Sequence, residues 1–149
     1  MKERKASLLL GMGNTIAGND GIGIAVARKV FERVGANGFD MIESSAAGWK
    51  LVDLLQGYER IIAIDSVMGS GCAVGECCSV APSGNGQVPC THSLGLHEAC
   101  ALLEGGQRLS VYAVEIGAAQ EFSESLSPEL EARVALIADQ IIEEEHLHA

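Results

Sequence analysis

The hydrophobic positions of this chain follow two alternating periods. Short apolar, β-branched runs typical of buried parallel strands occupy residues 7–12, 39–43, 60–65 and 109–115. Between them, apolar residues recur every three or four positions, as in amphipathic helices. Strands that alternate with helices predict an α/β fold, here a three-layer α/β/α sandwich around a mostly parallel, twisted sheet of about five strands. Residues 72–80 are expected to add an edge strand or hairpin.

The helical periodicity has clear limits. The predicted helices are residues 21–34, 49–55, 97–104 and 127–145. Gly35 is expected to end the first helix, and Ser127 and Pro128 to begin the last one. The predicted inward-facing residues are Ile22, Val26 and Val30, then Leu51, Leu54 and Leu55, then Leu130, Val134, Ile137 and Ile141. Residues 81–89 are expected to form a turn-rich loop, and residues 143–145 a solvated tail.

Length and charge narrow the class of protein. A chain of 149 residues suits one domain over residues 1–149. The formal charge of -10 argues against nucleic-acid binding, because that affinity depends largely on Lys and Arg. No apolar run approaches the roughly 20 residues that span a bilayer, and the first residues do not resemble a signal peptide. We therefore expect a cytoplasmic monomer with no membrane insertion and no nucleic-acid partner.

The five cysteines, Cys72, Cys77, Cys78, Cys90 and Cys100, lack the C-x2-C spacing of zinc and iron–sulfur sites. Reduced thiols are the expected state in the cytosol, where disulfides are rare. A redox or metal role for Cys77 and Cys78 remains the alternative.

A glycine-rich turn follows the first predicted strand and carries one acid, Asp20. Backbone N–H groups of such a turn could bind a dinucleotide phosphate, but Asp20 would repel it. The third glycine of the dinucleotide motif is also missing, since Asn14 and Thr15 follow Gly13. The turn is better suited to presenting a carboxylate to a cation or a polar substrate.

Asp20, Asp65 and His92 all lie at expected strand ends or loop junctions. Ligands of open α/β sheets bind at the carboxyl ends of the strands, so these three side chains could form an open site for a divalent ion such as zinc, nickel, manganese or iron(II). Each residue also has an ordinary structural explanation, because Asp commonly caps turns and His commonly lies on the surface. Weaker candidates are His97, His146, His148, Glu43, Glu76, Glu98 and Glu115. Motifs of zinc proteases, serine hydrolases and P-loop enzymes are absent.

Six ordered segments carry a family resemblance: LLLGMGN from residue 8, GWKLVDLL from 48, IAID from 62, THSLGL from 91, YAVEIG from 112 and LSPEL from 126. Together the chain resembles the hydrogenase maturation endopeptidases, which remove the C-terminal extension of the large-subunit precursor of nickel–iron (NiFe) hydrogenases. The resemblance implies that the partner of this chain is such a precursor, cut after nickel insertion. It also implies that the nickel comes with the substrate, while other divalent ions can occupy the site in a crystal.

In that family, an acid in the first loop, an Asp after the third strand and a later His bind the metal, which corresponds to Asp20, Asp65 and His92 here. Two departures concern Asn19, where the family usually has an acid, and residues 66–72, which lack the expected proline–glycine turn. Either the nickel polarises the peptide or activates a water, or it positions the substrate while Asp20 or Asp65 acts as the catalytic base. A nickel or small-ligand carrier of the same fold is the alternative function, and a nucleotide-binding domain is a third.

Overall fold

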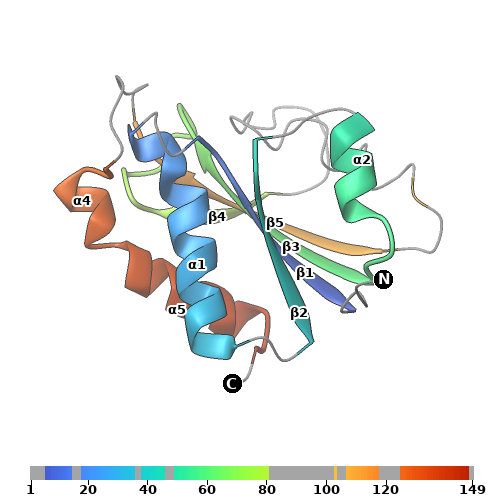
Figure 1. Ribbon diagram of the computed structural model, residues 1–149. Helices are drawn as coiled ribbons and strands as arrows, with labels where there is room; N and C mark the ends of the chain where they lie inside the picture. The colour runs from blue at the N-terminus through green and yellow to red at the C-terminus, as the bar shows by residue number, and fades with distance from the viewer. Residues whose placement is uncertain are drawn as a thin grey trace.

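The computed structural model describes residues 6–14, 18–35, 38–45, 49–80, 103, 107–117 and 125–147. Its strands are β1 (Ser7–Met12), β2 (Phe39–Ser44), β3 (Arg60–Val67), β4 (Cys77–Val80) and β5 (Arg108–Glu115). Its helices are η1 (Gly18–Gly21, a 3-10 turn), α1 (Ile22–Val34), α2 (Trp49–Leu55), α4 (Pro128–Glu131) and α5 (Val134–Glu144). Figure 1 shows these elements on the ribbon. None of the helices in these described ranges is long and apolar enough to cross a membrane.

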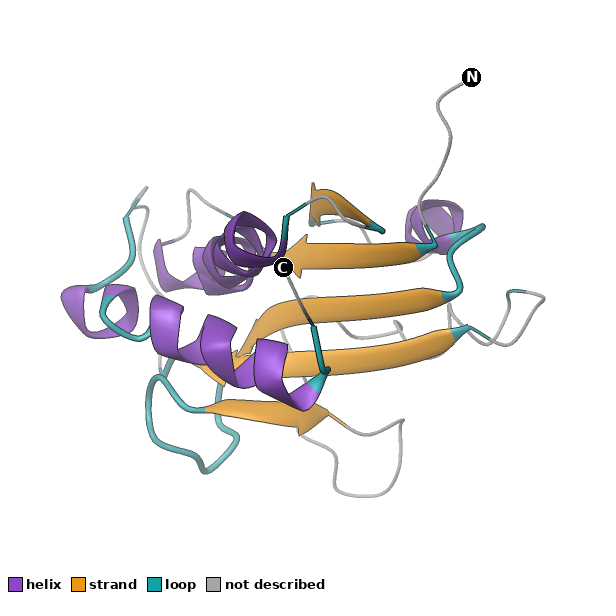
Figure 2. Ribbon diagram, turned by 90° about the horizontal axis from the view of Figure 1, so that it is seen from below, coloured by secondary structure: helices purple, strands orange, loops and turns teal. Residues whose placement is uncertain are grey.

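One sheet joins all five described strands in the order β2-β1-β3-β5-β4. β1, β2, β3 and β5 run parallel, and only β4 is antiparallel, paired with β5 at the edge. Helices α1 and α5 lie on one face of the sheet and α2 on the other, as Figures 1 and 2 show. The α/β sandwich with a mostly parallel sheet and an added edge strand is therefore confirmed.

Two hydrophobic clusters, one on each face, hold the layers together. Alternation along β1 sends Leu9 into the cluster under α1 and α5, and sends Leu8 and Leu10 into the cluster under α2. The predicted inward faces of α1 and of the C-terminal helices are buried as expected. On α2, Leu51 and Leu55 are buried, but Leu54 is only half-buried and Val52 lies deeper.

Three elements differ from the sequence prediction by two residues or more. β3 continues to Val67 and does not end at Asp65, because Ser66 and Val67 pair with β5. The C-terminal helix is divided into α4 and α5. The backbone hydrogen bond from Arg133 N to Leu130 O spans three residues, where an α-helix spans four, and it interrupts the helix. Within residues 72–80, only Cys77–Val80 forms a strand. The helix expected at 97–104, of which only Leu103 is described, and the loop at 81–89 lie outside the described residues.

The prediction that residues 143–145 form a solvated tail is wrong for Glu145. Its carboxylate accepts hydrogen bonds from Tyr112 Oη at 2.7 Å, Ser110 Oγ at 3.0 Å and Arg60 Nη2 at 3.1 Å. Burial alone would raise the pKa of Glu145, but these hydrogen bonds hold it below its ordinary value. Burial and the nearby Glu145 carboxylate also raise the pKa of Tyr112. Through these hydrogen bonds, Glu145 attaches the end of α5 to β3 and β5.

Replacing Glu145 by Gln is expected to lower the free energy of unfolding at neutral pH by about 1–3 kcal/mol, because three donors lose a charged acceptor. The folded-state pKa is depressed, so the contribution is full above the unfolded-state pKa of about 4.3 and is lost as the pH falls through the lower folded-state pKa. Urea unfolding at several pH values measures this. Glu143→Gln, at an exposed position nearby, should have little effect at any pH.

Candidate functional site

Asp20 lies in η1, between the end of β1 and the start of α1. The backbone N–H of Asn14 donates a hydrogen bond to Asp20 Oδ2 at 3.0 Å. Ser66 Oγ donates another to Asp20 Oδ1 at 2.8 Å. Asp20 is half-buried, and these two bonds orient its carboxylate over the carboxyl ends of β1 and β3.

Two glycines allow this close approach. Gly23, in the first turn of α1, lies so near the sheet that an added Cβ would come within 2.4 Å of Ile64 O and 2.5 Å of Met12 O. Gly13 has a φ of 153°, and a Cβ there would lie 2.3 Å from Asp20 O. These glycines therefore bring the loop that carries Asp20 down onto the sheet edge.

Asp65 and Ser66 are consecutive residues of β3, and both are fully buried. Alternation along the strand directs Asp65 toward the α2 face and Ser66 toward the α1 face, where it meets Asp20. Ser66 N donates a hydrogen bond to Asp65 Oδ1 at 2.7 Å. Ser66 thus contacts both candidate acids through different atoms, and it connects them across the edge of the sheet.

Ser66 was not among the candidates that the sequence indicated. The one available signal was a hydroxyl residue next to Asp65, directly after an apolar run, but serine is common at such positions. Its role depends on the approach of η1 to β3, which is a contact between residues 46 positions apart.

His92, the third candidate, lies outside the described residues. Within the ranges that the structure describes, no three His, Cys, Asp or Glu side chains form a group that could hold a metal ion. The described part of the chain therefore supplies two carboxylates at one sheet edge, and the three-ligand set stays a prediction.

Among the weaker candidates that the structure describes, Glu43, Glu76 and His146 are all exposed. Glu43 accepts a hydrogen bond from Arg28 Nη2 at 2.7 Å, and this pairing lowers the pKa of the carboxyl. His97, Glu98 and His148 lie outside the described residues.

Glu115 ends β5 and is buried, with 3% of its surface exposed. It accepts hydrogen bonds from Gly117 N at 2.7 Å, from Ser70 N at 2.8 Å and from the Ser70 hydroxyl. Burial alone would raise the pKa of Glu115, but hydrogen bonds from Ser70, Gly117 and Gly69 hold it below its ordinary value. Glu115 therefore shapes the loop after β3, which lacks the proline–glycine turn expected from the resemblance.

Asn19 has a structural use at the position where the family resemblance leads us to expect an acid. Its side chain is 4% exposed, and its Oδ1 accepts a hydrogen bond from Ser127 N at 2.7 Å. A neutral amide makes this bond without burying a charge. Asn19 thereby ties η1 to the residue that caps α4 through the bond from Leu130 N to Ser127 Oγ.

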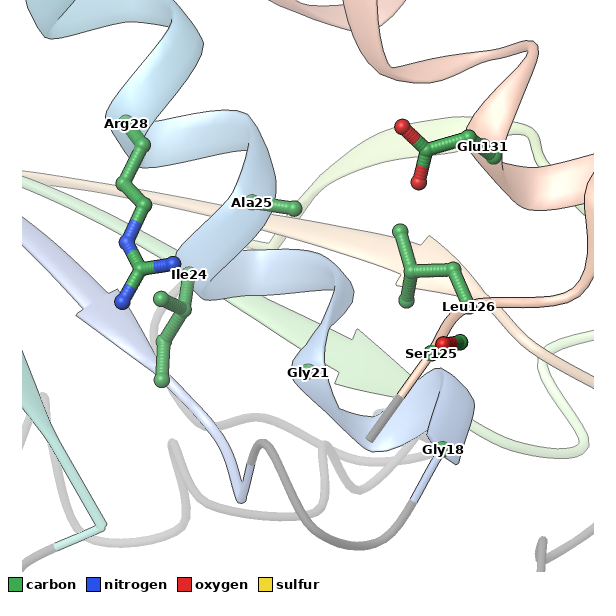
Figure 3. A pocket seen from close by; sticks show the side chains of 8 residues that line it. All are labelled: Gly18, Gly21, Ile24, Ala25, Arg28, Ser125, Leu126 and Glu131. Carbon is green, nitrogen blue, oxygen red and sulfur yellow. The ribbon is translucent and has the colours of Figure 1, made fainter. Parts of the chain in front are cut away.

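A pocket of about 450 Å³ opens beside this loop. Figure 3 shows Ala25 of α1 facing Leu126 and Glu131 across it. The lining also includes Gly18, Gly21, Ile24, Arg28 and Ser125, and the described residues in it do not include Asp20 or Asp65. The pocket therefore lies next to the candidate acids and not around them.

Neither a family model nor a curated protein matches the sequence. Solved structures do match. The hydrogenase maturating endopeptidase HybD from E. coli superposes with a TM-score of 0.74 at 20% identity, over 98% of this chain and 96% of that one. This chain has the fold of a hydrogenase maturation endopeptidase.

Two archaeal structures share this maturation-endopeptidase fold. The NiFe-hydrogenase maturation protease HybD from Thermococcus kodakarensis gives a TM-score of 0.69 at 24% identity, over 96% of this chain and 99% of that one. The maturation protease HycI from Thermococcus kodakarensis KOD1 gives 0.73 at 20% identity, over 94% and 92%. The fold that the sequence resemblance implied is thus confirmed over nearly the whole chain.

Proposed function

We propose that this chain is an endopeptidase that removes the C-terminal extension of a NiFe-hydrogenase large-subunit precursor after nickel insertion. The main support is the meeting of Asp20 with the Ser66–Asp65 segment at the carboxyl edge of β1 and β3. Open α/β sheets bind their ligands at this edge. The shared fold of the maturation endopeptidases agrees with the proposal.

In this proposal the nickel belongs to the substrate. Asp20, Asp65 and His92 complete the coordination of a nickel ion that the precursor already holds. Carboxylates and imidazole suit such an ion, and three protein ligands leave positions for the precursor's own ligands. A bound cation would also compensate the negative charge of the buried Asp65.

Hydrolysis then requires a water molecule at the scissile carbonyl. The water adds to the carbonyl carbon, its proton passes to Asp20 or Asp65, and a proton is returned to the leaving amine as the peptide bond breaks. The nickel either polarises the reacting groups or fixes the position of the precursor. In both cases, cleavage waits for nickel insertion.

The test compares three substrates at equal concentration: a nickel-loaded precursor, the nickel-free precursor, and a free peptide with the cleavage sequence. We expect a mobility shift and a released C-terminal peptide only with the nickel-loaded precursor. Cleavage of the nickel-free precursor would contradict the nickel dependence but not the peptidase activity. Nickel binding without cleavage of any substrate would favour a carrier.

Ser66 is a positioning residue in this scheme, since its hydroxyl holds Asp20. Ser66→Ala is expected to reduce kcat/KM by about tenfold, the loss of roughly one hydrogen bond to a charged group. The loss should fall on kcat more than on KM, because Asp20 is still present but no longer held by the Ser66 hydroxyl. Ser79→Ala, on the exposed side of β4, is the matched control and should change neither quantity. An unchanged kcat in Ser66→Ala would contradict the positioning role.

A further inference from the structure

Two thiols lie side by side at the edge of the sheet. Cys72, in the loop after β3, places its Sγ 3.2 Å from Sγ of Cys78 in β4. Both residues are half-buried, so small molecules can reach them. Among the described cysteines, all three carry free thiols. The pair was not foreseen from the sequence, where Cys77 and Cys78 were the residues considered for redox chemistry.

The backbone around the two thiols is held in place. Cys72 N donates a hydrogen bond to Ser70 Oγ at 3.2 Å, and Ser70 is bound in turn by the Glu115 carboxylate. On the other side of the loop, Gly75 N donates to Glu115 O at 2.8 Å, and Glu115 N donates to Glu76 O at 3.0 Å. The buried Glu115 therefore anchors both ends of the loop that joins the thiols, and their proximity is built into the fold.

We propose that Cys72 and Cys78 form a redox-active dithiol that small-molecule disulfides oxidise to an intramolecular disulfide. One of the two sulfurs, as its thiolate, attacks the small disulfide and displaces a thiolate. The second sulfur loses its proton, attacks the mixed disulfide and displaces the other small thiolate. Two protein thiols and one small disulfide thus become one protein disulfide and two small thiols. This inference does not depend on the proposed peptidase activity.

The geometry selects Cys78 over its neighbour Cys77. Successive residues of a strand point to opposite faces, and Cys77 packs against the cluster under α1 and α5. Burial raises the pKa of Cys77 to about 12, so it is a poor nucleophile. The hydrogen bond to Cys72, together with burial, raises the pKa of Cys78 to about 11, which makes the exchange slow at neutral pH.

Only a small movement is needed to form the bond. A disulfide has an S–S length of about 2.05 Å, so the sulfurs must approach by about 1 Å from their present separation. The closed ring would join β4 to the loop that leaves β3 directly after Val67. Oxidation therefore stiffens the segment next to the strand that carries Asp65.

The experiment uses the full chain with Cys90→Ser and Cys100→Ser, treated with oxidised glutathione and then with an alkylating agent. We expect a mass lower by two hydrogen atoms and a single alkylated thiol, Cys77. Cleavage after Glu76 should leave two peptides that stay joined until they are reduced. The unsubstituted chain should give the same joined peptides.

Single replacements identify the partners. Cys77→Ser should keep the linked peptides, whereas Cys72→Ser and Cys78→Ser should each lose them and retain only mixed disulfides with glutathione. Hydrogen exchange of the β4 amides should slow on oxidation in the parent chain but not in Cys78→Ser. Three alkylated thiols after oxidation, or a link that survives Cys78→Ser, would overturn the proposal.

Discussion

Replacing Asp65 by Asn is expected to abolish cleavage of a nickel-loaded precursor while the chain still folds. Asn keeps the size of the side chain and an oxygen that accepts the hydrogen bond from Ser66 N. It removes the charge that would bind nickel or accept a proton, and loss of a general base lowers rates by about 10²–10⁴-fold. Single-turnover cleavage, with the precursor in the nickel-loaded form, measures the effect.

Stability separates a functional from a structural role for Asp65. A fully buried carboxylate is costly, so Asp65→Asn should leave the free energy of unfolding unchanged or raise it. Asp53→Asn, at an exposed position of α2, is the control and should cleave at the parental rate. A large loss of stability in Asp65→Asn, or cleavage at the parental rate, would remove Asp65 from the proposed site.

Replacing Gly23 by Ala is expected to have the largest effect on stability, about 3 kcal/mol or more. The new Cβ would meet Ile64 O at 2.4 Å, Met12 O at 2.5 Å and Asp65 Cα at 2.9 Å, and all three are backbone atoms of buried strands. The usual gain of about 1 kcal/mol for Ala over Gly in a helix is too small to offset this clash. Urea unfolding measures the change, and Asp20 should lose its contact with Ser66 at the same time.

Gly35→Ala is the informative comparison for Gly23→Ala. Gly35 has a φ of 77°, but nothing lies within 4 Å of its missing Cβ. Its replacement therefore tests backbone strain alone, with an expected cost of about 1–3 kcal/mol, because φ 77° with ψ -176° is a region that only glycine readily adopts. If Gly23→Ala costs no more than Gly35→Ala, the close approach of α1 to the sheet is not what makes glycine necessary.

Local patterns predicted the layers of this fold well. β1 has the predicted limits, and the buried face of α1 follows its apolar spacing. Errors occurred where a distant partner decides the outcome. Pairing with β5 extends β3 past Asp65, and contacts with β3 and β5 draw Glu145 out of solvent.

In the candidate site, too, local sequence indicated some residues and missed one that depends on a distant contact. Asp20 could be selected from the sequence because an acid in a glycine-rich turn is unusual, and Asp65 because it follows an apolar run. Ser66 could not, since nothing near it in the chain indicates that η1 lies against β3. The role of His92 as a metal ligand stays a prediction, because His92 lies outside the described residues.

The bond between Asn19 and Ser127 also has a consequence for the pocket beside the candidate acids. One wall of that pocket comes from Gly18 and Gly21, on either side of Asn19, and the opposite wall comes from residues around Ser127. A single buried hydrogen bond thus joins the two walls and fixes the distance between them at one end of the pocket.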